Sequence, residues 1–127
     1  MSKILNHRGL LLLAGLLLIA VAASACGKSE PTSLTFDLTI VHQKLTPSRD
    51  LFVVKQGDQV TFKAQGDEVG LLHLHGYDLE VKVTPGETAQ LAFKADATGR
   101  FEIAWHPYVN AEETEGPTLS YLEVQPN

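Results

Sequence analysis

Hydrophobic and polar positions alternate in short runs along most of the chain. In LTFDLTIV, which starts at Leu34, apolar side chains occupy every second position and threonine or aspartate the positions between. Successive side chains of a strand point to opposite faces of a sheet, so this period of two predicts a strand with one buried face. No window has the 3.6-residue period of an amphipathic helix.

Further strand-like segments follow, each bounded by turn residues. TPGET, residues 84–88, places proline and glycine at the two central positions of a tight turn. Short strands at regular spacing are typical of antiparallel sandwiches and barrels. The pattern therefore predicts an all-β Greek-key sandwich of seven or eight strands, with strand segments in LTFDLTIV, LFVV, VTF, YDLEVKV, AQLAFKA, GRFEIAW and LSYLEV.

Two histidines, His73 and His75, lie two residues apart in the segment LLHLHGYDLE. On a strand they share one face, and the leucines between and before them share the other. If the strand ran regularly through Gly76, the histidines would continue the apolar face of YDLEVKV and point into the core. Two alternatives stay open: a β-bulge at Gly76 that turns the histidines outward, or two inward imidazoles.

Inward imidazoles would need polar partners, because an unpaired buried imidazole is costly. We expect either a metal ion or the carboxylates of Asp67, Glu68 and Asp78 to supply them.

A third histidine, His106, follows FEIAW and begins the long segment HPYVNAEETEGPT, which is expected to be irregular. Loop residues often complete binding sites, so we predict a metal site formed by His73, His75 and His106. The alternative for His106 is a solvent-exposed loop histidine. His42 is expected to be an ordinary surface residue. Imidazole ligands suit copper, zinc, nickel or iron, so the ligand type alone does not select the metal.

The N-terminus has the pattern of an export signal. Lys3 and Arg8 precede a long apolar run, and the small residues ASA precede Cys26. This resembles the lipobox of bacterial lipoproteins, in which the cysteine is acylated and becomes the new N-terminus, although Ala23 stands where leucine is usual. A plain secretory signal cut near Ala25 and an uncleaved anchor are the alternatives.

The lipobox resemblance implies an exported, membrane-anchored protein. We expect residues 1–25 to be the signal peptide, 26–33 a lipidated tether and 34–126 the folded domain. The anchor would hold the protein on the outer membrane facing the periplasm, or on the outer face of the cytoplasmic membrane.

Charge and sulfur content exclude several functions. Loss of Lys3 and Arg8 with the signal takes the formal net charge from −5 to −7, which disfavours binding to nucleic acid. Cys26 is the only cysteine and Met1 the only methionine. An acylated Cys26 leaves no thiol nucleophile and no thiolate ligand, so a blue-copper centre is excluded.

Two long segments, FVVKQGDQVTFKAQGDE and VTPGETAQLAFKADATGRFEIAW, resemble the cupredoxin family. The resemblance covers about residues 34–124, but Trp105 lies where cupredoxins place the copper cysteine. HLHG also resembles the H-x-H-G segment of multicopper oxidase domains, and HLHGYD a segment of small exported cupredoxin-like proteins. Trp105 is expected either to fill the core or to form a binding surface with Tyr108 and the nearby glutamates.

The resemblance implies the cupredoxin-like fold, and the paired histidines lead us to expect a lipid-anchored protein that binds copper and stores, delivers or senses it, with a copper-handling protein as partner. The alternative is a metal-free cupredoxin-like domain with an interaction or structural role. We do not expect an enzyme, because no nucleophile turn or substrate pocket can be identified in the sequence.

Overall fold

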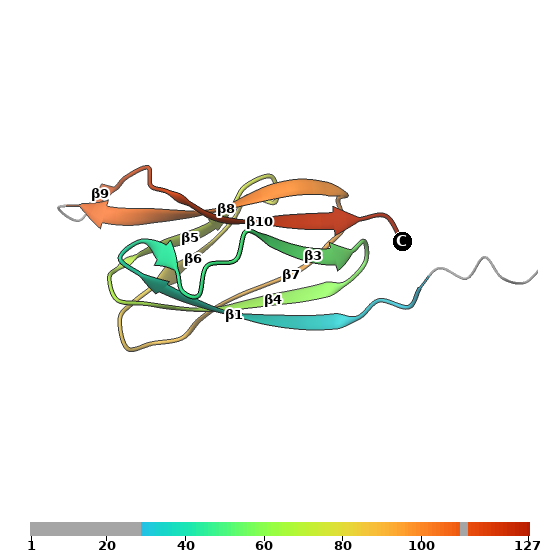
Figure 1. Cartoon of the computed structure of the whole chain (residues 1–127), viewed down its shortest axis with the longest axis horizontal. Helices are drawn as coiled ribbons and strands as arrows, with labels where there is room; N and C mark the ends of the chain where they lie inside the picture. Colours follow the sequence, from blue (N-terminus) through green and yellow to red (C-terminus); the bar gives the residue numbers. More distant parts are fainter. Residues whose placement is uncertain (1–28, 110–111) are drawn as a thin grey trace, which may run out of the picture.

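The computed structural model describes residues 29–109 and 112–127, and the predicted signal peptide and acylation site at Cys26 lie outside them. Within this part the chain is all β, and two sheets stack face to face (Figure 1). One sheet has the order β2-β1-β4-β7 and the other β3-β10-β8-β5-β6, with β9 paired to the end of β8. The strands are β1 (Ser33–Val41), β2 (Lys44–Leu45), β3 (Leu51–Lys55), β4 (Gln59–Gly66), β5 (Gly70–Leu74), β6 (Leu79–Val83), β7 (Ala89–Lys94), β8 (Gly99–Val109), β9 (Glu112–Glu113) and β10 (Thr118–Gln125).

The predicted β-sandwich is confirmed, with one difference in strand direction. Eight of the strands have five or more residues, which matches the number expected from the sequence. Two neighbouring pairs are parallel, β1 with β4 and β3 with β10, and the other pairs are antiparallel. The chain crosses between the sheets from β3 to β4, so strands from different hairpins become neighbours. These two parallel pairs are the difference from the antiparallel arrangement that the sequence favoured.

The core lies between the two sheets and follows the alternation in the sequence. Leu38 and Ile40 of β1 are buried, whereas the residues between and before them are exposed. Phe52 and Phe62 come from opposite sheets and pack edge to face with ring centroids 5.5 Å apart. Full burial of each such side chain contributes about 1.5–3 kcal/mol. The sandwich therefore has an ordinary apolar interior, to which both sheets contribute.

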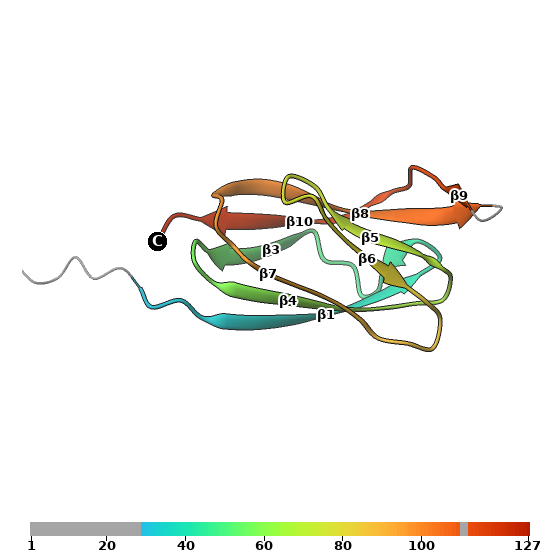
Figure 2. The same ribbon diagram turned by 180° about the vertical axis from the view of Figure 1, so that it is seen from behind.

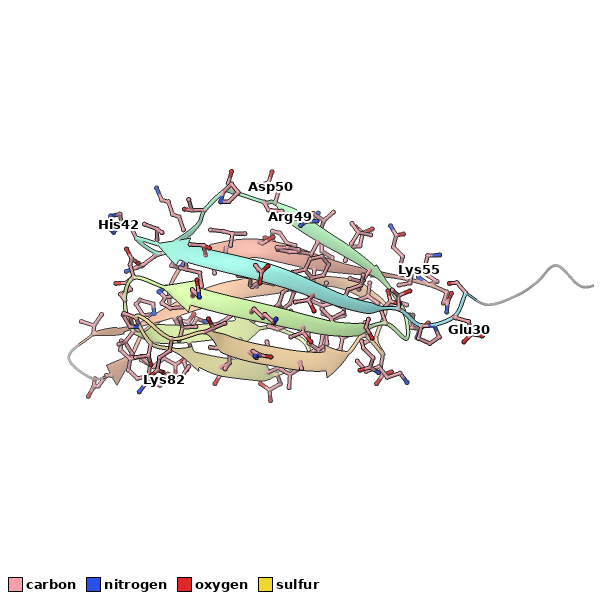
Figure 3. The ribbon with its side chains drawn as sticks, turned by 90° about the horizontal axis from the view of Figure 1, so that it is seen from below. Glu30, His42, Arg49, Asp50, Lys55 and Lys82 are labelled. Carbon is pink, nitrogen blue, oxygen red and sulfur yellow. The ribbon has the colours of Figure 1, made fainter. Side chains whose placement is uncertain are left out.

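Both ends of the described chain lie at one end of the sandwich. The Asn127 side chain accepts a hydrogen bond from Ser29 N at 3.0 Å and donates one to Ser29 O at 2.7 Å. In Figure 3, Glu30 and Lys55 lie at this end, and His42 and Lys82 lie toward the other. Among the described residues no helix has the length and hydrophobicity needed to cross a bilayer.

Candidate metal centre

The segment with the two histidines folds as a hairpin rather than as one strand. β5 ends at Leu74, which pairs with Leu79 at the start of β6, and residues 75–78 form the turn between them (Figure 2). Gly76 and Asp78 adopt positive φ angles of 81° and 55°, which glycine and aspartate tolerate best. The predicted strand YDLEVKV therefore starts two residues too early.

This turn decides which way the histidines point. Leu72 and Leu74 are fully buried in the core, so His73 lies on the outer face of the sheet. The alternative that the histidines point outward was right. A hairpin turn at residues 75–78, and not a bulge at Gly76, gives them this orientation. The inward alternative was wrong.

β8 brings the third histidine beside the first two. Across the β5–β8 ladder, His73 pairs with Ala104 and Leu71 pairs with His106, so His73 and His106 are diagonal neighbours on the outer face. His75 extends the same ladder, because its backbone N–H donates to Glu102 O at 2.9 Å. His106 lies inside β8 and is only 5% exposed. The expectation that it begins an irregular segment was wrong, and so was the alternative that it is a solvent-exposed loop histidine.

The three imidazole rings form a compact group. Ring centroids are 4.0 Å apart for His73 and His75, 5.1 Å for His73 and His106, and 5.9 Å for His75 and His106. One nitrogen from each ring lies within 4.8 Å of the other two. Metals bind imidazole nitrogen at about 2.0–2.1 Å, which separates neighbouring ligand nitrogens by roughly 3–4 Å. Small rotations of the side chains would therefore suffice for one ion to contact all three.

Two nitrogens of this group are buried without a hydrogen-bond partner, Nδ1 of His73 and Nε2 of His106. Leaving a buried polar atom unpaired costs about 1–3 kcal/mol. Nδ1 of His106 is 2.7 Å from Glu113 Oε1, and with its proton there it donates to the carboxylate. Nε2 then carries the free lone pair that a metal requires. The donor set therefore fits a metal ion bound by neutral imidazoles.

The carboxylates near the histidines differ from those expected. Glu80 lies opposite His73 in the β5–β6 ladder, and its Oε1 is 3.6 Å from His73 Nδ1. Asp67 instead contacts His42, with 3.1 Å between Asp67 Oδ2 and His42 Nδ1, and His42 is an exposed residue as predicted. Glu80 and Glu113 were missed because their positions depend on the turn before β6 and on the pairing of β9 with β8. A four-residue turn at HGYD, had it been identified, would have placed Glu80 opposite His73.

Trp105 lies on the opposite face of β8 from the histidines. It is fully buried in the core, so its expected core role is confirmed and its expected role in a binding surface was wrong. A Cβ at Gly70 would lie 2.3 Å from Trp105 Cζ2, so only glycine permits this packing. On the outer face, Ala104 is small and buried beside His73. β8 thus places the large Trp105 side chain on the core face, and the small Ala104 leaves room for the imidazoles on the outer face.

Similar solved structures share this architecture at low sequence identity. The periplasmic domain of cytochrome oxidase subunit II from Bradyrhizobium japonicum matches with a TM-score of 0.57 and 15% identity, over 80% of this chain and 88% of that one. The chain has the cupredoxin-like β-sandwich fold. The blue copper oxidase of Nitrosomonas europaea matches with a TM-score of 0.56 and 22% identity, over 76% of this chain but only 39% of that one.

A chain of a heme-copper terminal oxidase dimer matches with a TM-score of 0.54 and 17% identity, over 94% of this chain and 95% of that one. No protein-family model matches the sequence. No curated protein matches it either. At identities below 25%, the likeness to these solved structures establishes the shared cupredoxin-like fold.

Proposed function

We propose that this chain is an exported, lipid-anchored copper-binding protein that holds one ion through His73, His75 and His106. The observation that carries the proposal is the group of three imidazoles on one face of the sheet, two of them with buried nitrogens that lack a partner. A copper ion is favoured among the metals that bind imidazole because solved structures with this fold include a blue copper oxidase and a multicopper oxidase.

The proposed role is storage, delivery or sensing of copper, with a copper-handling protein as partner and no catalytic step. An all-imidazole site lacks the thiolate that tunes a blue-copper centre for electron transfer. Anchoring through Cys26 would place the domain in the cell envelope, facing the periplasm or the outside of the cytoplasmic membrane. The likeness to a domain described as periplasmic supports an exported location.

Electron paramagnetic resonance of the purified mature protein with Cu(II) tests the proposal. We expect one copper per chain and a signal split by coupling to imidazole nitrogens. His73→Ala/His75→Ala should abolish this signal, because it removes two of the three ligands. His42→Ala is the matched control and should leave the signal intact, because His42 is exposed and pairs with Asp67. An uncoupled signal, or one unchanged in the double variant, would refute the site.

The alternative function is a metal-free interaction or structural domain, and one of the residues proposed for its binding surface is not exposed. That hypothesis placed Trp105 on a binding surface, but Trp105 is in the core. Tyr108 and the glutamates around it remain as its only candidates. A native state whose stability responds to no metal would favour this alternative.

A further inference from the structure

Two carboxylates accompany the imidazoles of the candidate metal centre. Glu113 Oε1 is 2.7 Å from His106 Nδ1, and Glu80 Oε1 is 3.6 Å from His73 Nδ1. Strand pairing places both acids: Glu80 lies opposite His73 on β6, and Glu113 on β9 lies opposite Tyr108, two residues beyond His106. Glu80, Glu113 and His106 also form a compact group, with one ligating atom of each within 4.8 Å of the others.

Glu113 acts on a nearly buried ring. The His106 side chain is 7% exposed, so water competes little for its Nδ1. A carboxylate that accepts a hydrogen bond from Nδ1–H fixes the ring orientation, leaves Nε2 as the metal-binding atom and makes that atom more basic. Glu80 Oε1 lies 3.6 Å from His73 Nδ1, beyond hydrogen-bond distance, and the Glu80 side chain is 43% exposed, so Glu80 acts on the ion through its charge and does not position the ring. Its influence should therefore have the same sign and a smaller size.

The negative charge of these acids also acts on the ion itself. Coulomb energy is proportional to the product of the charges, so a carboxylate near the centre stabilises a divalent ion twice as much as a monovalent one. The three imidazoles are neutral ligands and contribute no such discrimination. The acids beside the rings therefore shift the preference of the site toward the divalent ion.

We propose that Glu113 is a positioning residue for His106 and that, with Glu80, it makes the centre favour Cu(II) over Cu(I). This inference rests on the proposed copper-binding function and specifies the form of the ion that the site holds. A protein with this preference would take up and release copper as the divalent ion.

Affinities for both oxidation states test the inference. Cu(II) binding is measured by competition with nitrilotriacetate, and Cu(I) binding by anaerobic competition with bicinchoninate. The variants are Glu113→Gln and Glu80→Gln, with Glu112→Gln as the matched control. Glutamine keeps an oxygen that can accept a hydrogen bond from Nδ1–H, so the exchange removes the charge while largely preserving the contact. Glu112 belongs to the same short strand, but its side chain points to the other face.

We expect Glu113→Gln to weaken Cu(II) binding by about 10–100-fold. Cu(I) binding should weaken by about half as many logarithmic units, roughly 3–10-fold, because its charge is half as large. Glu80→Gln should show a smaller effect in the same direction, and Glu112→Gln should match the wild type. In the metal-free protein, nitrogen chemical shifts should show the His106 proton on Nδ1.

Several results would overturn the inference. Equal losses for Cu(I) and Cu(II) in Glu113→Gln would mean that the residue acts on structure alone, and no loss would mean that it does not act on the ion. A second copper equivalent, coupled to the first and abolished by Glu113→Gln, would make the carboxylates direct ligands of another ion. Failure of the wild type to bind copper in either oxidation state would refute the proposed function together with the inference. Copper binding by the wild type with any of the results above would refute the inference alone.

Discussion

Asp58 shows how a single buried carboxylate joins separate parts of the sandwich. Its side chain accepts hydrogen bonds from Thr32 N at 2.8 Å and Lys55 N at 2.9 Å, and the residue is 5% exposed. Its backbone carbonyl accepts another from Ala95 N at 2.8 Å. The start of β1, the end of β3 and the end of β7 thus meet at one residue. In the sequence Asp58 reads only as part of the glycine turn KQGDQ, because its distant partners cannot be inferred from local pattern.

Replacing Asp58 with alanine should therefore destabilise the domain. Two hydrogen bonds to a charged acceptor are lost and their backbone donors are left in a poorly hydrated place, so we expect a loss of about 2–4 kcal/mol in the free energy of unfolding. Urea denaturation followed by the fluorescence of Trp105, the single tryptophan, measures it. Asp37→Ala is the control, because Asp37 is exposed on β1 and should change stability by less than about 0.5 kcal/mol. Similar losses in both variants would contradict the proposed role.

At the scale of elements, alternation identified most strands but not the turns that orient them. The β5–β6 hairpin illustrates this, because a four-residue turn and a one-residue bulge both change the face on which later side chains lie. β8 illustrates a second limit. Pro107 reads as a strand end because it lacks an N–H, yet its carbonyl accepts a hydrogen bond from Thr114 N at 3.0 Å and the strand continues to Val109. The ligand types could be predicted from sequence, and the carboxylates beside them could not.

The turn of this hairpin is tied to the turn between β7 and β8 through Tyr77. The Tyr77 hydroxyl donates to Ala97 O at 2.9 Å and accepts from Ala97 N at 3.1 Å. Burial raises the pKa of Tyr77 above its ordinary value of 10.0; the backbone hydrogen bond from Ala97 opposes this rise, and the nearby Asp96 carboxylate adds to it. The folded state therefore holds the tyrosine proton more tightly than the unfolded state does.

Stability should consequently fall in alkali in a way that depends on Tyr77. The contribution of the neutral phenol is fully present below pH 10 and is lost as the pH rises through the raised pKa, because the unfolded chain ionises first. Tyr77→Phe should lose about 0.5–1.5 kcal/mol near neutral pH, since its hydroxyl bonds are gone. Its stability should then decline less steeply than that of the wild type above pH 10. Parallel curves of unfolding free energy against pH would contradict this.

At the scale of the whole molecule, the candidate metal centre and the chain ends occupy different parts of the sandwich. The described chain begins and ends at one end, whereas β8 carries His106 toward the other, near β9 (Figure 1). His106 lies seven residues along β8 from Gly99, which is about 23 Å at 3.3 Å per residue. With the predicted anchor at Cys26, the centre would thus be held away from the bilayer, where a copper-handling partner in the surrounding aqueous compartment could approach it.

Binding at this centre should stabilise the entire domain, because the three ligands converge only when β5, its turn and β8 are folded. A ligand bound by the native state alone adds about 2.7 kcal/mol at a free concentration 100 times its dissociation constant. For a domain of this size, that gain should raise the melting temperature by about 10–20 °C. Binding of Cu(II) to histidines of the unfolded chain would reduce this rise in melting temperature. The double variant His73→Ala/His75→Ala should show almost no rise and therefore serves as the baseline. Running Zn(II) alongside ranks the metals. A melting temperature indifferent to every metal would instead identify a metal-free domain, with the imidazoles serving only as part of the sheet surface.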